Sequence, residues 1–244
     1  MNGLTTGPLA VPTLRGAFRL AATDFYFQSL RLVPANVAWG AGFLGVLAIG
    51  FWLSPALALV VAPLLCLPLV GVARLAAQIV RGDDVVLSDV TTAIRSHGLV
   101  ALAAGVVFEV ATLVAATNVI AGVSGGGAIG WAFAVLAGWG LAALWVVGLA
   151  FWPLLVDPAR DATPVGERAR LAGLVVLAHP ARFASLGASV AVVTIVSVVA
   201  LAALLSVSVA FIALVASRVT LATADQLEAR LSNSATTTDA IGQA

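Results

Sequence analysis

Residues 99–156 read LVALAAGVVFEVATLVAATNVIAGVSGGGAIGWAFAVLAGWGLAALWVVGLAFWPLLV, and this stretch decides the fold class. It contains one formally charged side chain, Glu109, and it is interrupted once, by the SGGG run at residues 124–127. Each half is at least as long as the roughly 20 apolar residues that a helix needs to cross the hydrocarbon core of a bilayer. We therefore expect a transmembrane hairpin, with one span on either side of the glycine turn.

The composition extends this conclusion to the whole chain. Hydrophobic residues make up 61% of it, charged residues only 9%, and the mean hydropathy is +1.11. A soluble domain carries roughly 25% charged residues, and a membrane β-barrel has short segments of alternating polarity rather than continuous apolar runs. The expected fold class is therefore all-α, a polytopic membrane protein in contact with the lipid bilayer. The net charge of +1 gives no sign of a nucleic-acid partner, and the lone Cys66 excludes an internal disulfide.

Six spans account for the apolar runs. Ser54-Pro55 divides the first run, because proline lacks the amide donor and disfavours helix just before it, and Pro63 and Pro68 should kink the second span. The expected spans are 32–53, 55–80, 99–123, 129–156, 183–204 and 206–223, arranged as three hairpins. Residues 1–31 then form a tail and an interfacial amphipathic helix, 32–223 the membrane domain, and 224–244 a polar tail that we expect to be disordered from Ser232 onward.

The uncharged segment 183–217 allows either one span or two. As one helix it would be about 52 Å long at 1.5 Å per residue, which exceeds the ~30 Å bilayer core. All twelve basic residues are arginines; six spans place every one of them on the same side, whereas five spans would put Arg218 and Arg230 on the opposite side. The positive-inside rule assigns the arginine side to the cytoplasm. We expect six spans in a bacterial inner membrane, with both termini cytoplasmic.

Two polar joints connect the hairpins, at residues 81–98 and 157–179. Each runs from acidic residues through a short amphipathic helix to a histidine and then into the next span. We expect the first of these interfacial helices to be capped by Ser88 and the second to begin at Thr163-Pro164. The parallel order of features resembles an internal repeat, but hairpins joined by interfacial helices can reach the same pattern independently.

Glu109 is the sharpest candidate for a functional residue inside the membrane. An ionised side chain near the middle of a span costs about 2.5–3.5 kcal/mol on insertion scales, and such residues often mark ion or proton pathways. Thr112 and Asn118 extend a possible polar stripe along the same helix. A proton- or cation-coupling site and a structural carboxylic acid bonded to another helix both explain this residue.

The joints supply a second set of candidates, as a surface for a partner. Arg74 is expected to pair with Asp83 or Asp84, or to extend to the interface, and the histidines to be satisfied side chains of the joints. The acidic residues could hold a cation, but none of their spacings matches a metal site, and no cofactor is expected. The candidate partner surface comprises Arg74, Arg81, Asp83, Asp84, His97, Arg168 and His179.

The joints also carry a family resemblance. The segments ARLAAQIVRGDDVVLSDVTTAIRSHGLVALAAG (73–105) and WPLLVDPARDATPVGERARLAGLVVLAHPARFASLG (152–187) resemble the YesL-like family of bacterial membrane proteins. That family has no established biochemical activity, and some members lie beside sugar-uptake transporter components in bacterial genomes. The resemblance implies a non-enzymatic accessory component of carbohydrate uptake, with permease or ATPase subunits as partners and no catalytic residues.

Two other functions remain open from the sequence. A self-sufficient transporter or channel for small solutes would use Glu109 and the kinked second span. An intramembrane enzyme is not expected, because no pair of catalytic groups lies at one depth. The abundant small residues in the spans permit close helix packing, either within one chain or in a homo-oligomer.

Overall fold

The computed structural model describes residues 9–200 and 207–242, and it is built from helices. Six of these are long and apolar enough to cross a membrane, so the fold is that of a polytopic α-helical membrane protein, as the sequence predicts. The spans are formed by α2 (Ser29–Trp52), α3 to α4 (Pro55–Arg81), α5 (Ser88–Gly125), α6 (Gly127–Leu155), α8 (Pro180–Val199) and α10 (Val209–Gly242).

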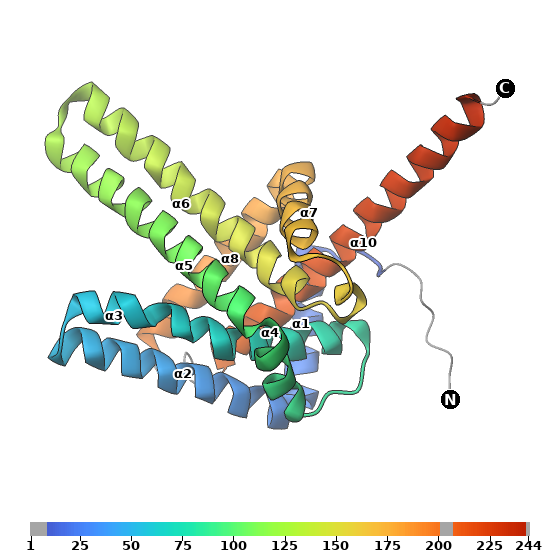
Figure 1. The fold of residues 1–244 in the computed structure, drawn as a ribbon, viewed down its shortest axis with the longest axis horizontal. Helices are drawn as coiled ribbons and strands as arrows, with labels where there is room; N and C mark the ends of the chain where they lie inside the picture. Colours follow the sequence, from blue (N-terminus) through green and yellow to red (C-terminus); the bar gives the residue numbers. More distant parts are fainter. Residues whose placement is uncertain (1–8, 201–206, 243–244) are drawn as a thin grey trace.

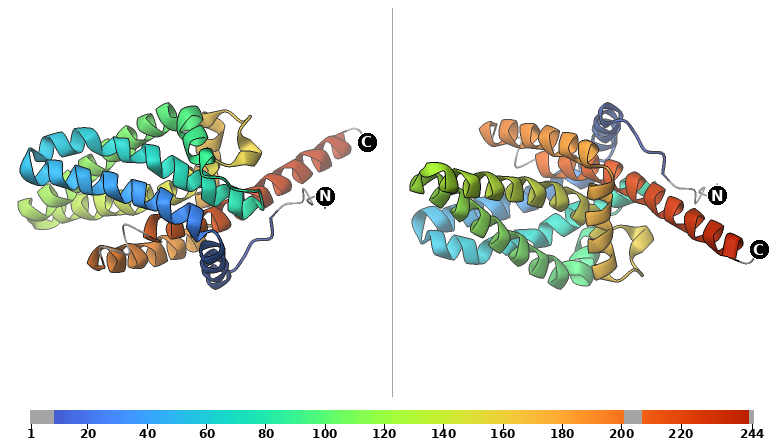
Figure 2. Two further views of the ribbon diagram at one scale, coloured as in Figure 1. Left: turned by 90° about the horizontal axis from the view of Figure 1, so that it is seen from below. Right: turned by 90° about the horizontal axis from the view of Figure 1, so that it is seen from above.

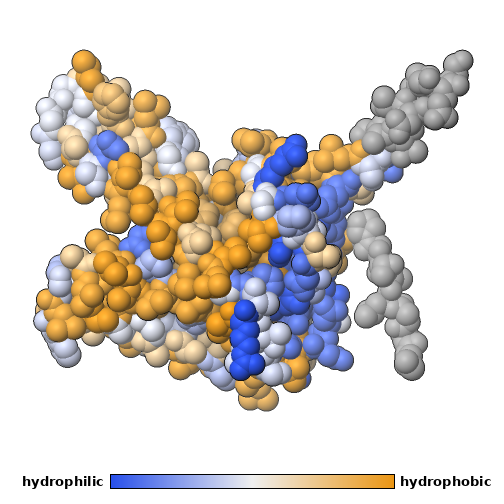
Figure 3. All heavy atoms as spheres, viewed as in Figure 1, coloured by the Kyte–Doolittle hydropathy of each residue, from blue (hydrophilic) through white to orange (hydrophobic). Residues whose placement is uncertain are grey.

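The spans run alongside one another, and the short turns lie at the opposite end of the bundle from the polar joints (Figures 1 and 2). In Figure 1 the hairpin of α2 and α3 diverges from the hairpin of α5 and α6 toward these turns. Hydrophobic side chains cover much of both hairpins, whereas hydrophilic ones gather at the other end of the bundle, around the joints that follow α4 and α6 (Figure 3). We call this region the polar end.

The second span is divided as its prolines dictate. It consists of α3 (Pro55–Val61), a 3-10 turn, η1 (Ala62–Leu65), and α4 (Cys66–Arg81). Pro63 lies in the 3-10 turn, which tightens the backbone where an α-helical hydrogen bond is lost. Pro68 falls in the first turn of α4, where the amide has no partner within the helix in any case. The predicted interruption is therefore concentrated at Pro63.

The third span differs from the prediction at its start. Helix α5 is continuous over 38 residues, so the first joint has no separate interfacial helix. Ser88 does not cap it: the helix begins without a side-chain cap, and the Ser88 carbonyl accepts from the hydroxyls of Thr91 and Thr92 at 2.8 and 3.1 Å. No proline separates Ser88 from the apolar run, and the helix continues into it.

Two helices cross the bundle at its polar end, as expected for interfacial segments. They are α1 (Leu14–Phe27) and α7 (Val165–Ala178), and Figure 2 shows both running across the direction of the spans. Ala17 and Ala21 of α1 are buried, while Tyr26 and Phe27 stay exposed, which suits aromatic side chains at a headgroup boundary. A short 3-10 turn, η2 (Pro158–Arg160), leads from α6 toward α7.

Helix α10 occupies the centre of the bundle. Its mean hydropathy of 1.3 is the lowest of the six spans, yet 67% of its most apolar window is buried, against 11–28% for the others. It packs against α1, α4 and α6. The least apolar span is thus the one most shielded from lipid, since the other helices face the bilayer. The tail expected to be disordered from Ser232 is described as helical through Gly242, where α10 ends, and residues 243–244 lie outside the described part of the chain.

Candidate functional site at the polar end

Five charged side chains from three parts of the chain form one network at the polar end. Arg81 donates to both oxygens of Asp157, at 3.0 and 2.6 Å, and to both oxygens of Asp225, at 2.6 and 3.0 Å. Arg160 contacts Asp157 and also donates to Asp225 at 2.7 Å and Glu228 at 2.6 Å. This ion-pair cluster, comprising Arg81, Asp157, Arg160, Asp225 and Glu228, joins α4, the second joint and α10.

Most of the cluster is shielded from solvent, and Glu228 lies at its exposed edge. The side chain of Asp157 is fully buried and that of Arg160 is 7% exposed. Burial lowers the pKa of Arg160, but its hydrogen bonds to Glu228 and Asp225 more than offset this, so that its pKa is raised. A buried charge with paired, bidentate partners stabilises a fixed geometry, and removal of one partner is costly. The cluster therefore fastens the polar end together.

A second group of contacts secures the start of the second joint. Arg74 donates to both carboxylate oxygens of Asp161, at 2.8 and 2.7 Å, and to the carbonyl of Val156 at 2.8 Å. The expected pairing of Arg74 with Asp83 or Asp84 is therefore wrong: the joint that follows α6 brings Asp161 to it instead. Arg168 is buried and donates to the carbonyls of Thr163, at 3.0 Å, and Leu155. Burial also lowers its pKa.

A polar cavity of about 420 Å³ opens between these contacts. We call it the joint pocket; it lies between α4, α5 and the start of α7. Its lining residues are Arg74, Gln78, Asp89, Thr92, Ala93, Ser96, His97, Val100, Asp161, Val165 and Arg168. The structure thus brings together three of the predicted joint residues, Arg74, His97 and Arg168, around one space.

Two side chains of the joint pocket have hydrogen-bonding capacity to spare. The buried Oε1 of Gln78 has no hydrogen-bond partner in the described part of the chain. His97 Nδ1 lies 2.7 Å from Ser96 Oγ, and its Nε2 is 3.7 Å from Asp161 Oδ1, which is beyond a good hydrogen bond. The pocket therefore offers the Gln78 carbonyl oxygen and the His97 Nε2 atom for a hydrogen bond, whereas its two arginines already bind groups of the protein.

The remaining joint candidates are separate from the pocket. Asp83 and Asp84 are exposed, and no ion pair engages them within the described residues. His179 ends α7, and its buried Nδ1 lacks a partner there. The two histidines of the joints are therefore not brought together at one site.

The predicted polar stripe inside the membrane does not form a site. Glu109 is half-buried and has no hydrogen-bond or ion-pair partner among residues 9–200 and 207–242. Asn118 is exposed and donates to the carbonyl of Val114 in its own helix at 2.8 Å, and Thr112 is exposed. None of the three lines the joint pocket. Within the described residues, neither a coupling partner nor an interhelical hydrogen bond reaches Glu109.

Sequence reasoning missed most members of the ion-pair cluster as site residues. Asp225 and Glu228 were assigned to the polar tail, although their i, i+3 spacing directly after the last span places both on one face of a continuing helix. Asp157 and Asp161 were interpreted as part of a solvated acidic face or, less readily, as a cation site, and each instead pairs with an arginine. Within the described residues, no three His, Cys, Asp or Glu side chains are grouped to hold a metal ion.

Comparison with known proteins adds no assignment to this geometry. The chain matches no protein-family model, no curated protein and no solved structure. The resemblance to the YesL-like family therefore stays a prediction from the joint sequences.

Proposed function

We propose that this protein is a non-enzymatic accessory component of a membrane assembly, which binds its partner through the polar end. The observation that carries the proposal is the division of the charges there into two classes. One class is paired within the chain, in the ion-pair cluster and the Arg74–Asp161 bridge, and most of its members are shielded from solvent by neighbouring helices. The other is exposed, without an ion-pair partner in the described residues: Asp83, Asp84, Arg95, Glu167 and Arg170.

These two classes suit different roles. The paired charges fix the relative positions of α4, α10 and the joints, and they are not free for a partner. The unpaired charges lie on the same joints and on α7, so a fixed framework presents them to the surroundings. Charges held in place on an ordered surface favour specific encounter with a complementary surface. This reading keeps Asp83 and Asp84 as partner residues and gives Arg74, Arg81 and Arg168 a structural role.

The opposite end of the bundle offers much less surface. The turn between α5 and α6 is formed around Gly126 and Gly127, and that between α2 and α3 by Leu53 and Ser54. Such short turns leave little room for recognition. We infer from the positive-inside rule that the polar end is cytoplasmic, where a permease or its ATPase subunit presents its own polar surface. Carbohydrate uptake enters the proposal through the family resemblance alone.

The alternative, a self-sufficient transporter driven through Glu109, finds less support. Transport sites near the midplane are built where several helices converge on a cavity. Glu109 has no such companions in the described residues and does not line the joint pocket. We therefore rank the accessory role first.

Co-purification from the native host in mild detergent tests the partner proposal. The test variant reverses four exposed charges, as Asp83→Lys, Asp84→Lys, Glu167→Lys and Arg170→Glu. The matched control reverses two exposed charges of α1, as Arg15→Glu and Arg19→Glu. We expect stoichiometric recovery of permease or ATPase subunits with the wild type and the control, and loss of these subunits with the test variant. Recovery of the wild-type protein alone would contradict the proposal.

Site-directed labelling tests the orientation. In a Cys66→Ala background, Asp84→Cys marks the polar end and Gly125→Cys the opposite turn; Gly125 has open space around it and no positive φ. We expect a membrane-impermeant maleimide to label the cysteine at 125 in intact cells and the cysteine at 84 only after the membrane is opened. The reverse pattern would place the polar end outside.

A further inference from the structure

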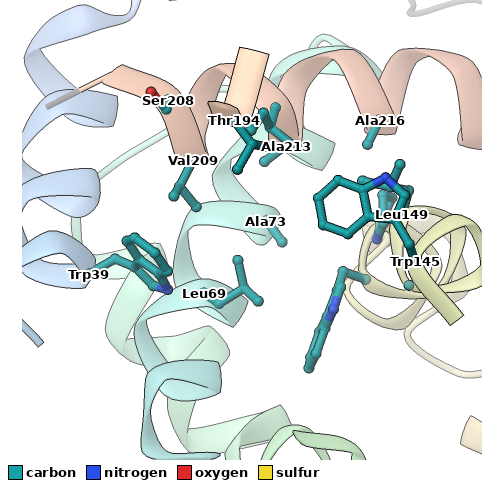
Figure 4. Close-up of a pocket in the computed structure, with 14 residues that line it drawn as sticks. Trp39, Leu69, Ala73, Trp145, Leu149, Thr194, Ser208, Val209, Ala213 and Ala216 are labelled. Atoms are coloured by element: carbon teal, nitrogen blue, oxygen red, sulfur yellow. The ribbon is translucent and has the colours of Figure 1, made fainter. Parts of the chain in front are cut away.

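A second cavity lies within the membrane-spanning part of the bundle. It has a volume of about 240 Å³ and is partly open to the surroundings. Its lining comes from α2, α4, α6, α8 and α10, and it includes Trp39, Trp145 and Trp152 together with the small side chains of Ala213 and Ala216. We call it the tryptophan pocket (Figure 4).

The shape of this pocket follows from the helices around it. Figure 4 shows Trp39 on one side and Trp145 on the other, with Val209, Ala213 and Ala216 along a third side. Small side chains on α10 leave the space that the indole rings border. Trp39 is held by stacking on Phe43, with ring centroids 5.4 Å apart. Trp39 lies in the interior of α2.

The polar groups of the lining are already engaged inside the protein. The Trp145 indole N–H donates to the carbonyl of Gly187 at 3.1 Å, and the Thr194 hydroxyl to the carbonyl of Val190 at 2.9 Å. The Ser208 hydroxyl donates to Ser197 Oγ at 2.5 Å. The surface left facing the cavity is almost entirely carbon. A polar solute would lose its hydration there without compensating hydrogen bonds.

The position and size of the pocket identify the occupant. An apolar cavity of about 150 Å³ inside a protein stays dry and accepts a benzene ring, and this one is larger. It lies among membrane spans and is partly open, so the nearest apolar material is the hydrocarbon of the bilayer. A flexible acyl chain can adapt to an irregular apolar space between helices, and dispersion contacts with indole rings favour it.

We propose that the tryptophan pocket binds one acyl chain of a membrane phospholipid, held apart from the lipids that surround the bundle. This binding is independent of the proposed partner at the polar end, because none of the exposed charged residues of the partner surface lines the tryptophan pocket. The bound chain completes the packing of α2, α4, α6, α8 and α10 where side chains leave a void.

Tryptophan quenching by a phospholipid with brominated acyl chains tests this proposal. Trp52, Trp131 and Trp139 do not line the pocket and are replaced by phenylalanine, which leaves the three tryptophans of the pocket as reporters. The probe lipid is titrated into delipidated protein in detergent. We expect quenching that saturates near one lipid per protein.

Variants of the lining distinguish the pocket from the outer surface. Ala213→Phe fills the pocket and should weaken the saturable binding at least tenfold, whereas Ile195→Phe adds a ring to an exposed position of α8 and should leave it unchanged. If Ala213→Phe does not give monodisperse protein, Gly148→Val serves instead, because only Phe108 lies near the added Cβ, at 3.8 Å. Quenching that never saturates, or equal affinity in the filled and control variants, would overturn the proposal.

Discussion

The two polar joints share one order of features in the sequence but differ in structure. In the first, exposed Asp83 and Asp84 precede α5, and His97 lies inside that continuous helix. In the second, Asp157 is buried and forms ion pairs with two arginines, and His179 lies at the break between α7 and α8. The apparent repeat is therefore not a repeat of geometry.

The residue after each histidine explains the difference in path. Gly98 follows His97 and is buried in α5, where a Cβ would come within 3.2 Å of Leu67 Cδ2. Pro180 follows His179 and begins α8, since proline fits the first position of a helix but cannot continue one. The comparison teaches that the order of polar and apolar segments does not set the path of a joint, whereas single residues at its ends do.

The largest expected effect on stability comes from replacing Asp157, the buried carboxylate of the second joint. Asp157→Asn removes the charge that faces both Arg81 and Arg160 in a buried site, and breaking such a pair costs about 3–5 kcal/mol. We expect a marked fall in the thermal unfolding midpoint in detergent. Asp83→Asn, the matched change in the first joint, should leave the midpoint unchanged because Asp83 is exposed. Equal effects of the two changes would mean that the joints do not differ in this way.

A proline after the first histidine should have the next largest effect. Gly98→Pro recreates the His-Pro pair of the second joint inside α5, and there it removes a backbone hydrogen bond and introduces a clash worth about 3 kcal/mol. We expect a lower unfolding midpoint and faster proteolysis near residue 98. Pro180→Ala is the control and should change the midpoint little. Tolerance of Gly98→Pro would show that α5 can break where the second joint does.

The smallest effect should come from the bridge between the joints. Asp161→Asn weakens the contact with Arg74, but Asp161 is 44% exposed, and such pairs contribute at most about 1 kcal/mol. Hydrogen–deuterium exchange of η2 and the start of α7 measures the local effect, which we expect to exceed the change in the global midpoint. A fall in the unfolding midpoint as large as that caused by Asp157→Asn would contradict this ranking and show that the Asp161 bridge stabilises the fold as much as the buried cluster does.

The spans were predictable because the bilayer leaves few alternatives. Backbone polar groups must be satisfied within the chain in hydrocarbon, so long apolar runs become helices. Prolines at 55 and 63 mark breaks that the structure also has. The start of α5 was missed because Ser88 was read as the cap of a separate helix, although no proline follows it before the apolar run.

The candidate site was predictable only in part. Arg74, His97 and Arg168 do converge on one pocket, but their partners lie far along the chain. Arg81 bonds to carboxylates 76 and 144 residues away, and no local pattern specifies such pairings. The choice of α10 as the central helix also depends on packing that hydropathy alone does not reveal.

The central position of α10 has a consequence for how the protein is made. It is the last of these spans to leave the ribosome, so the surrounding helices enter the bilayer before the segment that they enclose. Until Asp225 and Glu228 emerge, Arg81 and Arg160 share only Asp157 among the carboxylates of their cluster. Assembly therefore ends with a docking step: the least apolar span inserts among its neighbours, and its two carboxylates close the ion-pair cluster.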